Sequence, residues 1–196
     1  MNSKKIREMQ RSLTIQDMNR HRRLYNYIFL LYRNTSIKKD FCPVTNQILL
    51  TLPKLSFVPC FFLSYCLCRY NELFQISIED IKQNSSIKIK SSKSKHIKLL
   101  NSLPLYKPVL LRSIDLKTFI SVVSYDKLKM DILKTCRLLD IPKQKGLLDA
   151  THLFRHIEAS WLSENKVPLE QISYKLGHES NSSTSKYIHP IKQFYP

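Results

Sequence analysis

The chain contains few glycines, few acidic residues and no long hydrophobic run. Only two glycines, Gly146 and Gly177, occur among 196 residues. This excludes the glycine-rich loops with which P-loop and dinucleotide-binding enzymes hold phosphates. The apolar stretches Tyr25–Tyr32 and Leu55–Leu67 are short or interrupted by polar residues, so neither predicts a membrane span. The N-terminal residues MNSKKIREMQ are basic, but no apolar signal core follows them directly.

Cysteines are present but do not form a recognisable metal or disulfide pattern. The chain has five, an odd number, and no pair of CxxC motifs has the spacing of a zinc site. Cys60, Cys66 and Cys68 lie in an apolar run, where a free thiol behaves as a small hydrophobic group. The sequence therefore predicts a protein without a bound metal in a reducing, intracellular compartment, either a bacterial cytoplasm or an organelle such as a plastid.

Positive charge is the most prominent property of the composition. There are 32 Lys and Arg against 15 Asp and Glu, which gives a formal net charge of +17. Such a surface attracts polyanions through counterion release, which favours nucleic acid over an anionic membrane as the partner. The coding bias of an AT-rich genome, which enriches lysine, is an alternative source of the charge.

Hydrophobic periodicity predicts a mostly helical chain with one β-hairpin. Helices are expected at about residues 12–33, 55–74, 113–123, 126–139, 152–162 and 169–176. Residues 34–53, which include Pro43 and Pro53, are expected to be a connector, and residues 179–185 a polar turn. Between residues 86 and 100, alternating apolar and basic residues flank a serine-rich turn, which predicts a hairpin. Its exposed faces are expected to carry Lys90, Lys93, Lys95 and Lys98.

The segment THLFRHIEASWL brings a histidine and an arginine together. On a helix, His152 and Arg155 are three residues apart and project from one face. A guanidinium can grip two phosphate oxygens while an imidazole donates to a third or moves a proton. The plainer interpretation is a surface pair, because short motifs recur by chance. His156 is expected to be a supporting residue, since no third ligand accompanies it for a metal.

Two further segments gain meaning only in combination with the first. Gly177 can end a helix in a left-handed turn and leave His178 just beyond it, and Tyr187 follows nine residues later. Arg69 ends an apolar segment and requires an anion or a partner, which Glu72 could supply as a structural ion pair.

Taken in order, these residues resemble the tyrosine recombinase (phage integrase) family. CLCRYNELFQISIEDI resembles the family's first-arginine box, with Arg69 in the arginine place and Glu72 in the acidic place. KSSKSKHIKL is similar to the family's lysine hairpin, which assigns Lys90, with Lys93 as the alternative. THLFRH and LGHESNSSTSKYIHP resemble the remaining boxes. They assign His152 and Arg155 from the first, and His178 and the nucleophile Tyr187 from the second.

The resemblance implies a fold and a chemistry. The fold is an α+β, mostly helical tyrosine recombinase catalytic core with a small basic hairpin. Tyr187 would attack a DNA phosphodiester to form a 3′-phosphotyrosyl link, while Arg69 and Arg155 neutralise the phosphorane. Lys90 would protonate the leaving oxygen, His152 would act as base, and His178 would bond a non-bridging oxygen. No cofactor, metal or small-molecule substrate is implied, and the partners are double-stranded DNA and further copies of the chain.

The resemblance also suggests a division of the chain. Residues 51–196 correspond to the catalytic domain, and residues 1–50 are too few for the family's usual helical clamp. The chain is closest in size to the family's short, single-domain DNA invertases. Its first helix, with Arg20, Arg22 and Arg23, is expected to contact DNA together with Lys93 and Lys95 of the hairpin.

Three departures from the family keep other functions open. Besides the missing clamp, the tail IHPIKQFYP is a poor helix, and Cys66-Leu67-Cys68 replaces a glycine-containing turn. One alternative is a relict that binds DNA without recombining it. The other is an enzyme similar to type IB topoisomerases, which cuts with the same chemistry and does not exchange partners.

Overall fold

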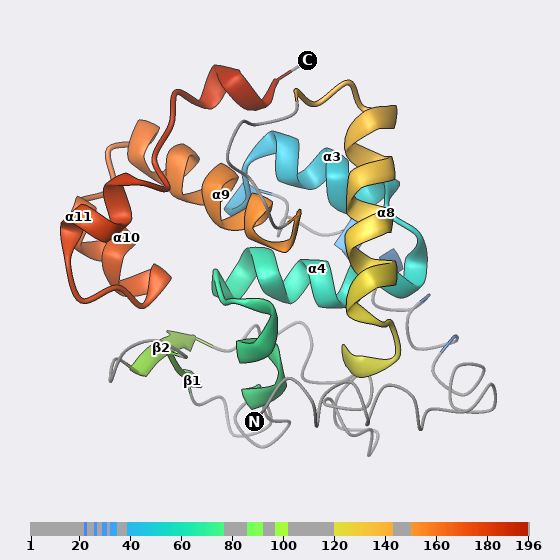
Figure 1. Ribbon diagram of the computed structural model, residues 1–196, viewed down its shortest axis with the longest axis horizontal. Coiled ribbons are helices and arrows are strands. Elements are labelled where there is room, and N and C mark those ends of the chain that lie inside the picture. The colour runs from blue at the N-terminus through green and yellow to red at the C-terminus, as the bar shows by residue number, and fades with distance from the viewer. Residues whose placement is uncertain are drawn as a thin grey trace.

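The computed structural model shows a mostly helical fold with one small sheet (Figure 1). It describes residues 39–76, 86–91, 97–101, 120–142 and 150–195, together with residues 22, 26, 29, 30 and 32–34. Figure 1 shows α4 (Lys54–Cys66) near the centre, with α9 (Leu153–Glu164) above it and α8 (Tyr125–Leu138) to one side. The α+β, mostly helical class that the sequence predicts is confirmed.

Helices α4 and α9, together with α3 (Pro43–Thr51), enclose the main hydrophobic core. Aromatic rings fill the space between them. Phe57 and Phe61 of α4 lie 5.2 and 5.7 Å from the ring of Tyr32, measured between ring centroids. Phe41 lies 5.5 Å from Phe61 in an edge-on arrangement. Burial of these large side chains is the main stabilising contribution to this part of the fold.

The expectation of a plain connector over residues 34–53 is wrong for its second half. Pro43 is at the start of α3, where its missing N–H costs nothing, and Pro53 follows the end of the helix. Val44, Ile48 and Leu49 of α3 are buried. The two prolines therefore mark the limits of a helix rather than an irregular segment.

The helix predicted over residues 55–74 is in fact two elements. α4 ends where Leu67 adopts a left-handed conformation, with φ 45°, and a 3₁₀ helix, η2 (Tyr70–Gln75), follows. A left-handed residue stops the α-helix because it reverses the sign of φ. Arg69 is thus placed immediately after a sharp turn and not within a continuous helix.

The predicted hairpin is confirmed as β1 (Ser86–Lys90) paired antiparallel with β2 (Ile97–Asn101). Ile89 is opposite Lys98, and Lys90 is opposite Ile97. Ile87 and Ile89 are buried, while Lys88 and Lys90 are exposed. The hairpin packs against η2 through β1 and against α10 (Leu169–Leu176) through β2.

The helix predicted over residues 126–139 is confirmed as α8. The Ser124 hydroxyl caps it by accepting a bond from the backbone N–H of Lys127, at 3.2 Å. Ser56 on α4 donates to the Asp131 carboxylate of α8 at 2.6 Å, which links the two helices. The helix predicted over residues 113–123 lies almost wholly outside the described residues. Most of the helix over residues 12–33 lies there too, although residues 22, 26, 29, 30, 32 and 33 within it have helical backbone.

The C-terminal region carries the remaining elements around α9. A 3₁₀ turn, η4 (Ala150–His152), leads into α9, and α10 ends at Gly177, as predicted. The segment expected to be a polar turn contains a short helix, α11 (Asn181–Ser185), and the tail forms η5 (Ile191–Phe194), which packs on α9. Within the described residues, no helix has the length and apolar character needed to cross a membrane.

Glu158 is a buried carboxyl that ties α9 to the start of α3. The backbone N–H of Cys42 donates to both of its oxygens, at 3.1 and 3.3 Å. Burial raises the pKa of Glu158 to about 8 from its ordinary value of 4.5. Between these two pH values the folded chain holds a proton that the unfolded chain releases, so Glu158 lowers stability as pH rises.

We therefore expect Glu158→Gln to flatten the pH dependence of stability. The free energy of unfolding of the wild-type chain should fall relative to that of the variant as pH rises from about 5 to 8. Urea unfolding at several pH values measures this difference, with Glu164→Gln at an exposed position of the same helix as the control. Parallel curves for wild type and Glu158→Gln would contradict the expectation.

Candidate active site

Arg155 is a fully buried arginine on α9, and two helix ends supply its hydrogen-bond acceptors. Its Nη1 donates to the backbone carbonyl of Leu67, the C-cap of α4. Its Nη2 donates to the carbonyl of Leu176, the last residue of α10, at 3.0 Å. Carbonyls at helix C-termini have no partner within the helix and carry the negative end of its dipole, so both suit a cation.

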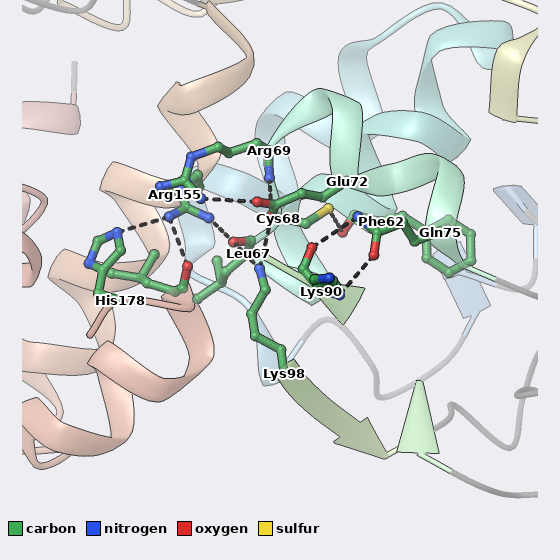
Figure 2. A network of polar contacts seen from close by, with 11 residues as sticks. Phe62, Leu67, Cys68, Arg69, Glu72, Gln75, Lys90, Lys98, Arg155 and His178 are labelled. Atoms are coloured by element: carbon green, nitrogen blue, oxygen red, sulfur yellow. Dashed lines mark hydrogen bonds and ion pairs between the residues drawn. The ribbon is translucent and has the colours of Figure 1, made fainter. Parts of the chain in front are cut away.

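A second group of charged side chains surrounds the same turn (Figure 2). Arg69 Nη1 donates to Glu72 Oε1 at 3.0 Å, and the backbone N–H of Arg69 donates to Glu72 Oε2 at 2.9 Å. Lys98, from β2, donates to Glu72 Oε2 at 3.3 Å and to the Leu67 carbonyl at 3.2 Å. We call Arg69, Glu72, Lys98 and Arg155 the charge cluster.

The charge cluster has more positive than negative charge. Its one carboxylate, Glu72, is fully buried and pairs with Arg69 and Lys98, whereas Arg155 is held by backbone carbonyls. Burial, followed by the nearby Arg69, lowers the pKa of Arg155, yet a guanidinium stays protonated at any physiological pH. Arg155 Nε has no hydrogen-bond partner among the described residues. The unbalanced charge and the unused donor together favour binding of an anion at this point.

His178 follows Gly177 and lies beside Arg155. Its Nε2 is 3.2 Å from Arg155 Nη2, and its Nδ1 is 3.0 Å from Thr184 Oγ1. Arginine can only donate, so Nε2 accepts and the ring proton lies on Nδ1, which donates to Thr184. Burial and the nearby Arg155 lower the pKa of His178 to about 4. The imidazole is therefore neutral and helps to orient Arg155.

Tyr187 lies against the same groups, after α11. Its ring centroid is 5.1 Å from the Arg155 guanidinium carbon and 5.1 Å from the ring of His178. The ring of His156 covers it at 4.5 Å. The Ser160 hydroxyl donates to the Tyr187 carbonyl at 3.2 Å, so α9 holds the backbone of the tyrosine as well as its ring.

His156 and His189 contact each other beside Tyr187 and support its position. His156 Nδ1 and His189 Nε2 are 3.0 Å apart, which joins α9 to the segment just after Tyr187. Burial lowers the pKa of His156 to about 4, with His189 as the next cause. His152 is the N-cap residue of α9; its side chain is half-buried and makes no capping hydrogen bond. The expectation that His156 is a supporting residue agrees with these contacts.

The predicted site residues do not all converge. Arg69, Glu72, Arg155, His178 and Tyr187 lie together. Lys90 is exposed on the opposite face of the hairpin from Lys98. Its backbone N–H donates to Gln75 Oε1 at 2.8 Å, and its carbonyl accepts from Gln75 Nε2 at 2.9 Å. Arg22 is exposed on helical backbone, whereas Arg20, Arg23, Lys93 and Lys95 lie outside the described residues.

Lys98 is the member of the cluster that sequence reasoning missed. It was expected on an exposed face, but it is fully buried while its neighbours Ile97 and Leu99 are 51% and 46% exposed. The pairing explains this inversion, because Lys98 is opposite the buried Ile89 and must point the same way. Glu72 gives a general signal, because a buried carboxylate needs a cationic partner, but it does not indicate which hairpin lysine supplies one.

The cysteines beside the site act as packing residues. Cys66 and Cys68 flank Leu67 and are buried, and burial raises the pKa of the Cys68 thiol to about 12. Both thiols are therefore neutral. In the part of the chain that the structure describes, no group of three or more His, Cys, Asp or Glu residues could hold a metal ion.

Comparison with known proteins identifies the chain at the level of a family. The model of the phage integrase family matches residues 54–193. The chain belongs to the phage integrase family. The match includes every residue of the charge cluster as well as His178 and Tyr187.

Solved structures agree with the family at the level of the fold. The chain is similar to a structure described as the crystal structure of XerA recombinase, with a TM-score of 0.51 and 18% sequence identity. The similarity covers 91% of this chain and 79% of the XerA chain. At this identity it shows the fold of a phage integrase catalytic core. Curated proteins give no match.

For this phage integrase family member, the hydrogen bonds of His178 predict which of its ring nitrogens is protonated. We expect nitrogen NMR of the histidine rings to show His178 protonated at Nδ1 and neutral well below pH 6.5, because Arg155 occupies Nε2. The spectrum of His178→Asn assigns the signal. A proton on Nε2, or titration near 6.5, would contradict the hydrogen bonding described above.

Proposed function

We propose that the chain is a DNA strand-transfer enzyme, a tyrosine recombinase that cleaves and rejoins DNA through a 3′-phosphotyrosyl intermediate. The observation that carries this proposal is the position of Tyr187. Its ring is 5.1 Å from the guanidinium of Arg155, at the edge of a cluster with more cations than anions. A phosphate attracted to that charge would lie within reach of the phenolic oxygen.

In the proposed reaction the Tyr187 oxygen attacks the phosphorus of a DNA phosphodiester. A tyrosyl P–O bond forms, and the bond from phosphorus to the 5′-oxygen breaks. Arg69 and Arg155 stabilise the extra negative charge of the phosphorane, which is where fixed cations contribute most. The intermediate conserves the energy of the original ester, so the reverse attack by a 5′-hydroxyl rejoins DNA without a nucleotide.

Protons move through neighbouring side chains in this proposal. His152 takes the proton of the Tyr187 hydroxyl, and Lys90 gives one to the departing 5′-oxygen. Lys90 lies on the hairpin face opposite Lys98 but is exposed and so is accessible to DNA, and Lys93, which lies between the two strands in the sequence, is the alternative donor. A bound phosphate would raise the pKa of His178, and the protonated Nε2 could then donate a hydrogen bond to a non-bridging oxygen.

The proposed partner is double-stranded DNA. The net charge of +17 supports it, as do the basic hairpin and the arginines near residue 20. Exchange of strands requires several active sites, so we propose that two to four copies assemble on DNA.

The test uses nicked suicide duplexes, in which the cleaved end is lost and the covalent complex accumulates. Because the target sequence is unknown, the duplexes contain a randomised region. We expect the wild-type chain to form a covalent protein–DNA adduct and Tyr187→Phe to form none, since phenylalanine lacks the attacking oxygen. Tyr195→Phe is the matched control, because Tyr195 is an exposed tyrosine of the same tail and should leave the adduct unchanged.

Other outcomes separate the alternatives. Salt-sensitive DNA binding with no adduct on any duplex would refute the enzyme and support a DNA-binding relict. Adducts accompanied by plasmid relaxation but no strand exchange would support the topoisomerase-like activity. An adduct that survives Tyr187→Phe would contradict the assignment of the nucleophile.

A further inference from the structure

Lys98 is a fully buried lysine whose amine is held by protein oxygens. The described contacts of its Nζ are the Leu67 carbonyl at 3.2 Å and Glu72 Oε2 at 3.3 Å. A buried ammonium is tolerated only when it is paired in this way. Desolvation lowers the pKa of Lys98, and Cys68 and Glu72 oppose that shift.

Each acceptor of Lys98 also serves one of the two arginines (Figure 2). Glu72 accepts from Arg69 Nη1 through its other oxygen, and the Leu67 carbonyl accepts from Arg155 Nη1. Lys98 therefore connects the two guanidinium groups through the acceptors that orient them. The contact of Lys98 with Glu72 Oε2 also limits how much of this carboxylate the Arg69 side chain can occupy.

The aliphatic stem of Lys98 makes a further contact with the site. A Cβ placed on Gly177 would lie 3.2 Å from Lys98 Cδ, tighter than an ordinary contact. The stem thus packs against the turn that ends α10 and precedes His178. Through one side chain, β2 touches the end of α4, the acidic residue of η2 and the end of α10.

We propose that Lys98 is a positioning residue of the strand-transfer reaction, acting through Glu72 and the Leu67 carbonyl to hold Arg69 and Arg155 ready for the phosphate. This role rests on the proposed function. In this proposal Lys98 does not itself contact the phosphate, because the described contacts of its amine are protein oxygens, whereas Arg155 Nε has no partner among the described residues. Without its ammonium, the Arg69 guanidinium could shift toward Glu72 Oε2, which already accepts from the Arg69 backbone N–H, and so move away from the DNA.

The test compares Lys98→Met with Lys90→Met and Lys93→Met in single-turnover cleavage. Each variant receives an ordinary duplex and one in which sulfur replaces the 5′-bridging oxygen. Sulfur departs as a thiolate without needing a proton, so the second duplex restores a variant that lacks only the proton donor. We expect Lys98→Met to slow cleavage about 100-fold on both duplexes, as misplacement of a catalytic group does, with little change in DNA affinity. The variant that lacks the proton donor, Lys90→Met or Lys93→Met, should recover on the sulfur duplex.

A double-mutant cycle separates positioning from a general loss of structure. Glu72→Gln combined with Lys98→Met removes one charge of each sign, so the pair should fold even where Lys98→Met alone is unstable to heat. If Lys98 acts through Glu72, its replacement should cost much less in the Glu72→Gln background than in the wild type.

Four results would overturn the proposal, and they differ from one another. Recovery of Lys98→Met by the sulfur duplex would make Lys98 the proton donor. Unimpaired cleavage by Lys98→Met would remove any role, and additive effects in the cycle would remove the action through Glu72. Absence of an adduct with the wild-type chain would refute the proposed function and this role with it.

Discussion

The buried charge of Arg155 is the constraint on which the rest of the site depends. An unpaired guanidinium in the interior would destabilise the fold by several kcal/mol (about 3–5). The chain meets this cost with carbonyls at the ends of α4 and α10 and with the imidazole of His178. Both helices end in a left-handed residue, Leu67 and Gly177, which leaves the carbonyls of Leu67 and Leu176 available to accept from Arg155. The turns that end α4 and α10 therefore also supply the carbonyl oxygens that bind the Arg155 guanidinium.

Much of the fold could be predicted from local sequence signals. α8, α9, α10 and the hairpin have clear periodicity, a capping serine or a terminating glycine, and each is present as predicted. α3 was missed because Pro43 and Pro53 are typical of loops, and only the burial of α3 against α4 and α9 shows that they mark the limits of a helix. The break after Cys66 was missed because Leu67 adopts a conformation that usually requires glycine.

The sequence predicts which residue types could form the candidate site. It does not predict contacts that depend on residues brought close only by the fold. Arg69, Arg155, His178 and Tyr187 were proposed because their order along the chain is distinctive, and the structure places them close together. Lys98 could not be chosen among the hairpin lysines, since its inward direction depends on pairing with Ile89. The neutral tautomer of His178 likewise follows from Arg155, a neighbour 23 residues away in the sequence.

The backbone around Tyr187 is anchored on both sides by its own chain. Ser160 of α9 donates to the carbonyl of Tyr187 and accepts from the N–H of His189. Ile191 and Phe194 of η5 are buried farther along. On the proposed chemistry, the tyrosine and the arginines that serve one phosphate come from the same polypeptide. In a mixed assembly, a chain lacking Tyr187 and a chain lacking Arg155 would each have an inactive site, and neither chain could complement the other.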